Sequence, residues 1–595
     1  MQTNQLNTAQ QLNNAQQLLT EHLAIWTSAE TEKKSGRGRA SGSVGSVFGI
    51  KKLRELILEL AVRGKLVPQD ANDEPASELL KRIQAEKAKL IAEGKVKKEK
   101  PLAPITEDEK LFELPSGWEW VYLDDIGTTS IGLTYSPKDI SNNGIPVLRS
   151  SNIQGGKIDL LDLVRVDTKI KENLFVKDGD LLICARNGSK ALVGKTAMIK
   201  SLNEPMVFGA FMAIYRGQFN PYIQTFLISP IFRKFLDGIE TTTINQITQN
   251  NLKTTLTPLP PLAEQHRIVA KVDALMALCD QLENQHLNAA EAHEALVSEL
   301  LATLTQNQDA ADFNTNWQRI YAHFDVLFTT QASIAALKQT LLQLAVMGKL
   351  VPQDPNDEPA SELLKRIQAE KAKLITEGKL KKEKPLATIS EGEMPFDLPQ
   401  GWKWTSLLNA AVINPRNTAL DDTQASFVPM TLIGSAFNDK HQDEKRLWKE
   451  IKQGFTHFAD GDIGVAKITP CFENSKACVF ENLESGLGAG TTELHIVRPV
   501  KNTLNPRYVL AYLKSPRFLA LGESKMTGTA GQKRLPKDFV ESNPFPLPPL
   551  TEQHSIVAKV DELMALCDQI KLRITEAKKL QQKLADVMVE SAVAS

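Results

Sequence analysis

The sequence predicts an α+β protein in which two blocks of mixed α/β structure alternate with long helices that occur twice. Three observations support this fold class. Two long segments recur almost unchanged, one of them carries a continuous apolar stripe at helical spacing, and the stretches between the copies alternate short apolar runs with Gly, Asn and Ser. At 595 residues, the chain is long enough for about three to five domains with cores of their own.

The first repeated segment comprises residues 60–102, which recur 284 positions later as residues 344–386 with only four of 43 residues changed. The similarity continues at the same offset, with LFELPSGWEWVYL in the first copy and PFDLPQGWKWTSL in the second. Residues 77–92 are predicted to form a helix that ends at Gly94, because glycine is a common helix stop. The second copy is predicted to form the same helix.

The second repeated segment, PLPPLAEQHRIVAKVDALMALCDQLE, begins at Pro258, and its copy, PLPPLTEQHSIVAKVDELMALCDQIK, begins 288 positions later at Pro546. Its prolines and first-turn glutamate suit a helix start. From Ile268 onward, apolar residues recur mostly at steps of three and four, which predicts a long helix that packs on another helix. A helix from Leu262 to about Leu304 would be on the order of 60 Å long. Two such stripes in one chain suggest a pseudo-twofold internal repeat in which they pack on each other.

The two blocks between the repeats share a framework but differ in their loops. Both contain short apolar strands broken by turn residues, as in KDGDLLICARNGSKALVGKTAMI and ADGDIGVAKITPCFENSKACVF. Gly179-Asp180 aligns with Gly461-Asp462, and Asn220-Pro221 aligns with Asn505-Pro506. We therefore expect two related α/β domains with divergent surfaces. A separate Gly/Ser-rich stretch at 35–49 is predicted to be a flexible surface segment.

Composition excludes several classes of protein. The net charge is −1, so a polyanionic partner would have to bind a local basic patch. The five cysteines are scattered without a CxxC pair, which favours a reducing cytoplasm over a disulfide framework or a zinc site. The amino-terminal sequence lacks a signal-peptide pattern, and no apolar run approaches the ~20 residues of a membrane span. A cytoplasmic protein without membrane contact is expected.

Repeated helices that separate two unlike blocks are typical of a spacer that holds two binding modules. A helix of about 60 Å covers more than the ~34 Å of one turn of DNA. Two modules on rigid helices could bind two half-sites of a DNA sequence and ignore the bases between them. Because the two blocks differ, their half-sites would differ as well.

The duplicated motifs LPSGWEW, AVRGKLVPQDANDEPASELLKRIQAEKAKL and PLPPLAEQHRIVAKVDALMALCDQLE resemble those of the DNA-specificity subunit of type I restriction-modification systems, of the enteric bacterial kind. The resemblance covers nearly the whole chain. It implies that each variable block is a target recognition domain, and that the repeated helices form an antiparallel coiled coil that fixes their spacing. The expected target is a bipartite, asymmetric sequence in double-stranded DNA.

The resemblance also implies partner subunits. Two modification subunits would methylate adenine with S-adenosylmethionine, and restriction subunits would use ATP and Mg²⁺ to translocate and cut DNA. The implied domain plan has five parts: an N-terminal helical repeated region at 1–110, a first recognition domain at 111–257, a central helical repeated region at 258–394, a second recognition domain at 395–545 and a C-terminal repeated helix at 546–595.

No catalytic motif of these partners occurs in the chain. The nearest sequence to a phosphate-binding loop, GSKALVGKT at 188–196, has one residue too many between its glycines. NPFP at 543–546 resembles the NPPF signature of adenine methyltransferases, but its third residue is Phe545. We therefore predict a non-catalytic subunit that binds no cofactor and no metal of its own.

Base edges are contacted by Arg, Lys, Asn and Gln, and phosphates by Lys, Arg, Ser and Thr. In the first block three polar stretches offer such side chains: Arg149 and Asn152; Arg186, Asn187, Ser189, Lys190 and Lys195; and Asn245, Gln246 and Gln249. In the second block two stretches do so: Lys467, Thr469, Asn474 and Lys476; and Thr529, Gln532, Lys533 and Arg534. Gln246 and Gln532 lie at similar distances before Pro258 and Pro546, so their loops are expected to correspond.

Simpler interpretations compete with these. Any single Asn or Gln could be a turn residue. The side chains of Trp118, Trp120, Trp402 and Trp404 are expected to pack where helix meets recognition domain. A second possible function is a protein–protein scaffold whose two α/β modules bind polypeptides. The Asn/Gln/Thr-rich loops favour DNA, since a scaffold would more often expose aromatic and Met-rich loops.

Overall fold

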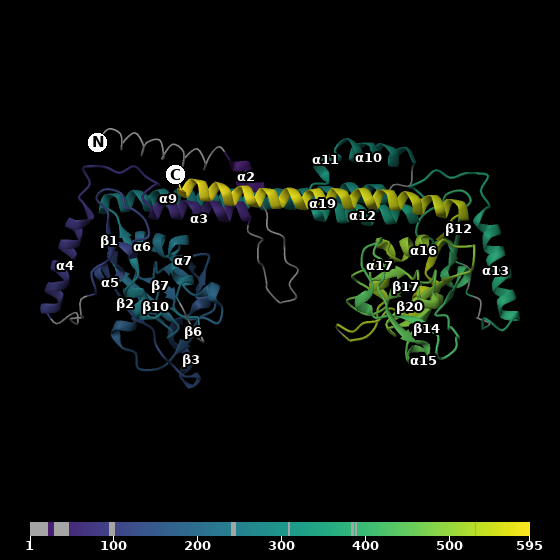
Figure 1. The fold of residues 1–595 in the computed structure, drawn as a ribbon, viewed down its shortest axis with the longest axis horizontal. Helices are drawn as coiled ribbons and strands as arrows, with labels where there is room; N and C mark the ends of the chain where they lie inside the picture. The colour runs from purple at the N-terminus through teal and green to yellow at the C-terminus, as the bar shows by residue number, and fades with distance from the viewer. Residues whose placement is uncertain are drawn as a thin grey trace. The chain divides into compact units, whose positions relative to one another are not determined.

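The computed structural model describes residues 22–28, 47–93, 102–239, 245–306, 310–381, 386, 389–529 and 531–594. The chain divides into two compact units: unit 1 contains residues 1–288 and 577–595, and unit 2 contains residues 289–576. Each unit combines helices with an α/β lobe, so the protein is α+β, as predicted (Figure 1). Most of the predicted flexible stretch at 35–49, the predicted stop Gly94 and Thr243 of the polar loop lie outside the described residues.

The repeated segments form the predicted helices. Outside its α/β lobe, the described part of unit 1 contains the helices α2 (Leu23–Ser28), α3 (Phe48–Val62) and α4 (Ala76–Ala92). Those of unit 2 are α10 (Ala310–Ala322), α11 (Phe324–Leu327), α12 (Gln331–Val346) and α13 (Ala360–Thr376). Two helices of 45 residues each, α9 (Leu262–Gln306) and α19 (Leu550–Ala594), contribute residues to both units.

In unit 1, helix α3 packs against parts of both long helices. Its Arg54 forms ion pairs with Asp280 and Glu283 of α9, each at 2.7 Å. On another side, Lys52 Nζ lies 3.0 Å from Asp586 Oδ1 of α19. In the same cluster Cys279 is buried, as the apolar stripe predicted, together with residues of all three helices.

Lobe 1, the α/β part of unit 1 from β1 to β11, is built around a four-stranded sheet in the order β2-β10-β7-β8. These strands are β2 (Gly127–Ile131), β7 (Leu181–Cys184), β8 (Thr196–Met198) and β10 (Met212–Gly217). A second sheet has the order β6-β3-β9, with β3 (Ile140–Leu148), β6 (Val164–Val166) and β9 (Val207–Phe208). The shorter elements are β1 (Glu119–Tyr122), α5 (Leu123–Ile126), β4 (Ile153–Gln154), β5 (Lys157–Ile158), α6 (Asn220–Leu227), α7 (Pro230–Asp237), α8 (Gln249–Lys253) and β11 (Leu256–Leu259).

Lobe 2, the α/β part of unit 2 from β12 to β21, has a first sheet in the matching order β13-β20-β17-β18. Its strands are β13 (Ala411–Ile413), β17 (Ile463–Ala466), β18 (Ala477–Val479) and β20 (Leu494–Pro499). The second sheet, β15-β14-β19-β16, has four strands: β14 (Gln424–Val428), β15 (Glu444–Leu447), β16 (Thr456–Ala459) and β19 (Leu487–Gly490). The remaining elements are β12 (Lys403–Ser406), α14 (Leu407–Ala410), α15 (Trp448–Ile451), α16 (Pro506–Leu513), α17 (Pro516–Lys525), α18 (Lys537–Ser542) and β21 (Pro544–Leu547).

The aligned Gly-Asp pairs have the same role in both lobes. Asp180 and Asp462 are both buried and accept hydrogen bonds from an arginine on the neighbouring strand. Arg216 Nη2 donates to Asp180 Oδ2 at 2.5 Å, and Arg498 Nη2 donates to Asp462 Oδ2 at 2.7 Å. These ion pairs tie β10 to the turn before β7 in lobe 1, and β20 to the turn before β17 in lobe 2. The shared framework predicted from sequence is therefore confirmed for these positions.

Each lobe is joined to its long helix by a buried tryptophan, as expected. Trp118 Nε1 donates to Glu264 Oε2 at 2.9 Å, and Trp402 Nε1 donates to Glu552 Oε2 at 2.8 Å. Burial raises the pKa of both glutamates, whereas the hydrogen bonds from tryptophan and a neighbouring glutamine act in the opposite direction. The glutamates at the helix starts therefore hold the lobes through direct hydrogen bonds.

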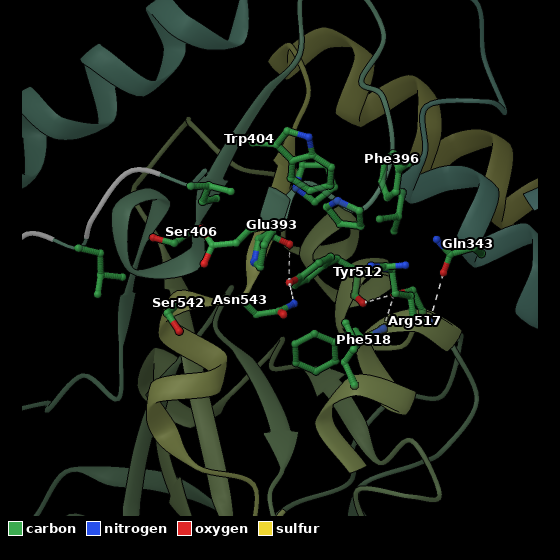
Figure 2. A pocket seen from close by; sticks show the side chains of 18 residues that line it. Gln343, Glu393, Phe396, Trp404, Ser406, Tyr512, Arg517, Phe518, Ser542 and Asn543 are labelled. Carbon is green, nitrogen blue, oxygen red and sulfur yellow. Dashed lines mark hydrogen bonds between the residues drawn. The ribbon is translucent and has the colours of Figure 1, made fainter. Parts of the chain in front are cut away.

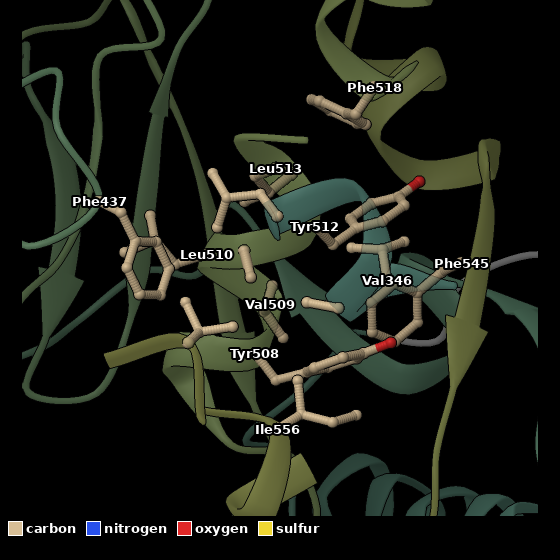
Figure 3. Packing of buried hydrophobic residues seen from close by; sticks show 14 of the residues in the cluster. Val346, Phe437, Tyr508, Val509, Leu510, Tyr512, Leu513, Phe518, Phe545 and Ile556 are labelled. Atoms are coloured by element: carbon tan, nitrogen blue, oxygen red, sulfur yellow. The ribbon is translucent and has the colours of Figure 1, made fainter. Parts of the chain in front are cut away.

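The core of unit 2 is continuous from the helices into lobe 2 (Figure 3). Tyr508 and Tyr512 of α16 both pack against Phe545 of β21, with ring centroids 5.9 and 4.9 Å away. Figure 3 shows the helical residues Val346 and Ile556 beside them, and all five side chains are buried. Tyr508 and Tyr512 donate their hydroxyl protons to the carbonyls of Pro546 and Pro544, at 2.9 and 3.0 Å. Helices and lobe are therefore parts of one packed body within this unit. Among the described residues no helix is long and apolar enough to cross a membrane.

Candidate nucleic-acid interface

Two polar loops meet at one end of lobe 1. The loop after β7 and the segment before α8 are joined by a bridge between Arg186 and Gln246. On either side of it, Ile247 N donates to Ala185 O at 2.7 Å and Asn187 N donates to Asn245 O at 3.2 Å. We call this junction tip 1. It brings together two of the three polar stretches predicted from the sequence.

The same construction closes lobe 2. The loop after β17 meets the segment before α18 through a bridge between Ile468 and Arg534. Leu535 N donates to Lys467 O at 2.7 Å, and Thr469 N donates to Lys533 O at 3.0 Å. We call this junction tip 2. Both polar stretches predicted for the second block contribute to it.

Strand register defines which residues of the two tips correspond. Met212 pairs with Cys184 in lobe 1, and Leu494 pairs with Ala466 in lobe 2. Counting onward from these pairs, Gln246 corresponds to Arg534, because both form the bridge to the loop after the central strand. The two loops that were expected to correspond therefore do so, with Arg534 at the place of Gln246.

Tip 1 combines an arginine with an exposed aromatic ring. The Arg186 guanidinium carbon lies 5.1 Å from the centroid of the Phe211 ring, within the range of a cation–π contact. Phe211 O accepts hydrogen bonds from the backbone N–H groups of Ala185 and Arg186, both at 3.0 Å, and the Phe211 side chain is 58% exposed. Sequence reasoning missed Phe211, because a phenylalanine in the apolar run GAFMAI has the pattern of a core residue.

Tip 2 has an ion pair at the matching place. Lys467 N donates to Glu493 O at 3.0 Å, so Glu493 occupies the position that Phe211 has in tip 1. Its carboxylate accepts from Arg534 Nε and Nη2, with N–O distances of 3.0 and 2.9 Å. These hydrogen bonds hold the pKa of Glu493 below its usual value. The sequence carried no signal for Glu493, since the pair forms only when two distant segments meet.

The side chain of Asn152 is committed to the fold. It is 1% exposed, and its Oδ1 accepts from Arg149 N at 2.8 Å. Its Nδ2 donates to the carbonyls of Asp159 and Asp162, both at 2.9 Å. Arg149 in turn pairs with the Asp162 carboxylate at 3.1 Å. Asn152 therefore shapes the loop and offers no free donor or acceptor to a ligand.

Several other predicted contact residues use their side-chain nitrogen on a backbone carbonyl. These hydrogen bonds run from Lys195 to Ile153 O at 2.7 Å, from Lys476 to Met430 O at 2.8 Å, from Gln249 to Thr129 O at 2.7 Å and from Asn245 to Gly188 O at 3.1 Å. Thr469 is buried, and its Oγ1 accepts from Lys533 N at 3.1 Å. These hydrogen bonds fix the polar segments to the neighbouring backbone.

The remaining predicted residues lie at the surface of the tips. Those that are exposed are Ser189, Lys190, Gln246, Asn474, Thr529, Gln532, Lys533 and Arg534, and those that are partly exposed are Arg186, Asn187 and Lys467. Lys190 pairs loosely with Asp237 at 3.5 Å. Each tip therefore presents a cluster of hydrogen-bond donors and cationic groups, which is the chemistry needed for base edges and phosphates.

A buried lysine supports tip 2. Lys514 is 1% exposed and donates through Nζ to Ser435 O at 2.8 Å and to Ser475 O at 2.7 Å. Ser475 belongs to the loop after β17, so the lysine fixes that loop against the end of α16. Burial lowers the pKa of Lys514 to about 8. Ile228 occupies the corresponding position in lobe 1, directly before the Ser-Pro start of α7.

Unit 2 also contains a cavity of about 450 Å³ (Figure 2). Its walls include Gln343, Phe396, Trp404, Ser406, Arg517 and Phe518. Asn543 of the NPFP sequence lines it, and its Nδ2 donates to Tyr512 Oη at 2.6 Å. The next residues form β21, in which Phe545 is buried. This sequence therefore serves as a strand in the core. Among the described residues no cluster of His, Cys, Asp and Glu has the geometry of a metal site.

Two α/β lobes that carry polar tips on the same backbone frame define a protein with two related binding modules. Comparison with known proteins identifies its family. The model of the type I restriction modification DNA specificity domain matches residues 115–292. The chain is 39% identical to the type I restriction enzyme EcoEI specificity subunit of Escherichia coli, over 97% of this chain and 99% of that protein. It is also 39% identical to the EcoAI specificity subunit of Escherichia coli, over the same shares.

The chain therefore belongs to the type I restriction enzyme specificity subunits, and its role is that of a DNA-specificity subunit, as the duplicated motifs indicated. A solved HsdS subunit from Thermoanaerobacter tengcongensis is 19% identical, with a TM-score of 0.39, and the match covers 82% of this chain and 98% of that one.

Proposed function

We propose that each lobe reads one half of a bipartite, asymmetric sequence in double-stranded DNA, and that tip 1 and tip 2 are the base-contacting surfaces. The recognition domains would be residues 111–257 and 395–545. One observation carries the proposal: the two tips have the same backbone construction but carry different polar side chains. A common frame with unlike contact residues is what two different half-sites require.

The long helices would set the distance between the half-sites. We propose that α9 and α19 form an antiparallel coiled coil along a pseudo-twofold repeat. Two features support this: each helix has 45 residues, and each contributes residues to both compact units. In unit 1, α3 forms ion pairs with both. Because these helices would be stiff, they would fix the number of unread base pairs between the two half-sites.

The repeated helices would also dock two modification subunits, one per copy. In unit 1, α19 exposes Leu580, Leu584 and Val587 by 66%, 46% and 57%. Their spacing of four and three places them on one helix face, and an exposed apolar stripe is suited to a partner helix. S-adenosylmethionine would bind to the modification subunits, and ATP and Mg²⁺ to the restriction subunits. All five cysteines are free thiols, which suits work in a reducing cytoplasm.

The proposal is tested by fluorescence anisotropy with a labelled duplex and the full chain purified with its modification subunit. We expect duplex binding that weakens about tenfold or more when Arg186 and Arg534 are both changed to Ala. The matched control changes Arg165 of β6 and Arg446 of β15, which are partly exposed arginines in the second sheets of the two lobes. Equal weakening by both double variants would refute the tips as the contact surface. Absence of any duplex binding, with peptide binding instead, would favour the scaffold function.

A further inference from the structure

The ion pair of tip 2 uses only one edge of the Arg534 guanidinium. Nε and one N–H of Nη2 point to Glu493, so the side-on edge of the planar group is occupied. The end-on edge, formed by Nη1 and the second N–H of Nη2, faces away from that carboxylate. Among the residues that the structure describes, Nη1 has no hydrogen-bond or ion-pair partner, and 48% of the side chain is exposed.

The backbone beneath this side chain is fixed on both sides. Arg534 N donates to Thr527 O at 2.8 Å, and Thr527 N donates to Arg534 O at 3.1 Å. The same residue bridges Ile468 on the opposite loop. The next side chain, Leu535, is 2% exposed and anchors the segment in the core. Both the starting point and the plane of the guanidinium are therefore set before any ligand arrives.

We propose that Arg534 determines specificity for a guanine in the half-site of lobe 2, with Glu493 as its positioning residue. The inference rests on the proposed function of tip 2. Two parallel N–H donors on a rigid plane match the O6 and N7 acceptors that guanine presents in the major groove. A carboxylate that holds the side-on edge leaves that donor pair aimed outward and lowers the entropy lost on binding.

A purely structural role for the pair is the simpler explanation. Exposed ion pairs contribute little to stability, so replacement of either partner should leave the lobe folded. A structural role would therefore predict no change in the DNA sequence that is recognised. Base specificity distinguishes the two explanations, since only a residue that contacts a base, or one that positions such a residue, can relax one position of the target and leave the others intact.

The test maps methylated adenines in the genome of cells that express the full chain with its partner subunits. Replacement of residues 396–548 by the matching block of another family member first identifies which half-site lobe 2 reads. The wild-type map is expected to contain an invariant guanine there. Arg534→Lys keeps the charge but lacks the paired donors, and it should relax that one position about tenfold or more. Arg534→Gln, which copies Gln246 of tip 1, should shift the preference there toward adenine.

Two further variants complete the design. Glu493→Gln should relax the same position by less than Arg534→Lys does, because the guanidinium remains but is no longer held. The control Arg446→Lys, an exposed arginine paired with Glu444 and stacked on Phe427 in the other sheet of lobe 2, should leave the map unchanged.

The inference is overturned if Arg534→Lys leaves every position as in the wild type. It is also overturned if this variant weakens methylation of all sites uniformly, as loss of a phosphate contact would. Failure of the proposed function gives a different result. A wild-type map without two separable half-sites would refute the proposal that each lobe reads one half-site through its tip.

Discussion

The two tips share a backbone and differ in where they place their arginine. In tip 1, Arg186 extends from the loop after the central strand and lies over Phe211. In tip 2, Ile468 stands at that place, and the arginine, Arg534, comes from the opposite loop to pair with Glu493. The comparison shows that the hydrogen-bonded junction is the backbone feature that the two lobes share. Side chains on it can change chemistry, and even loop of origin, without altering how the loops meet.

The second sheets of the lobes provide a further contrast. Lobe 2 has a four-stranded second sheet, whereas lobe 1 has a three-stranded one. The buried Phe458 and Phe480 of lobe 2 stack with ring centroids 3.7 Å apart. This stack belongs to a buried cluster that joins strands of both sheets of lobe 2.

The largest expected effect comes from removal of that stacked core. Phe458→Ala should lower the stability of lobe 2 by about 3–5 kcal/mol, because the cavity it leaves lies among fully buried side chains. Hydrogen exchange followed by mass spectrometry should show loss of protection in β14, β16 and β19. Protection of the lobe 1 strands should be unchanged. An equal loss of protection in lobe 1 would show that the lobes do not fold as separate units.

A second prediction compares the tryptophan junctions. Trp118→Phe and Trp402→Phe each leave a buried glutamate without its indole donor, so each should cost about 1–3 kcal/mol. Because both junctions have the same geometry, the two losses should agree closely. Denaturant unfolding monitored through peptides of each lobe measures them. A large loss of stability for one variant and none for the other would show that the two junctions are not equivalent.

Lys514 provides a prediction for lobe 2 alone. Its folded-state pKa of about 8 lies below the ordinary 10.5, so above pH 8 the folded lobe releases a proton that the unfolded chain retains. The contribution of Lys514 to the stability of lobe 2 should therefore rise between about pH 8 and 10.5, by on the order of 3 kcal/mol, against the opposite contribution of Cys478, whose pKa burial raises to about 12. Lys514→Met should abolish this slope, as measured by urea unfolding across that pH range. Persistence of the full slope in the variant would assign it to another group.

The smallest effects are expected where the short helices meet the long ones. Arg54 of α3 pairs with two carboxylates, whereas among the described residues Lys338, at the same repeat position in α12, pairs only with Asp568. Arg54→Ala should therefore destabilise its unit more than Lys338→Ala, and both by about 1 kcal/mol or less. Thermal unfolding at low and high salt measures this, and the difference should shrink at high salt. A larger loss for Lys338→Ala would contradict the comparison.

The helical half of the fold was predictable because its signals are local. The apolar stripe, the prolines before Leu262 and the repeat itself define where α9 and α19 begin. The Trp118 and Trp402 positions were also interpreted correctly as junctions. Family membership followed from the duplicated motifs for the same reason, since each motif is a continuous stretch of sequence.

The tips were only partly predictable, because they form from segments far apart in the chain. The polar loops that meet at each tip were identified and matched with each other, but the equivalence of individual residues, such as Gln246 and Arg534, was not predicted. Phe211 has the sequence pattern of a core residue, and Glu493 and Lys514 gain their roles only through partners 39 to 79 positions away. Conversely, Asn152 has the composition of a contact residue and is buried in its own loop.

The claim that each lobe reads its own half-site is tested most directly by a genomic map of methylated adenines for a chimera. In it, residues 396–548 are replaced by the matching block of another family member, with the partner subunits unchanged. The account predicts that one half of the bipartite target changes while the other half and the spacer length stay as in the wild type. A change in both halves, or in neither, would contradict it.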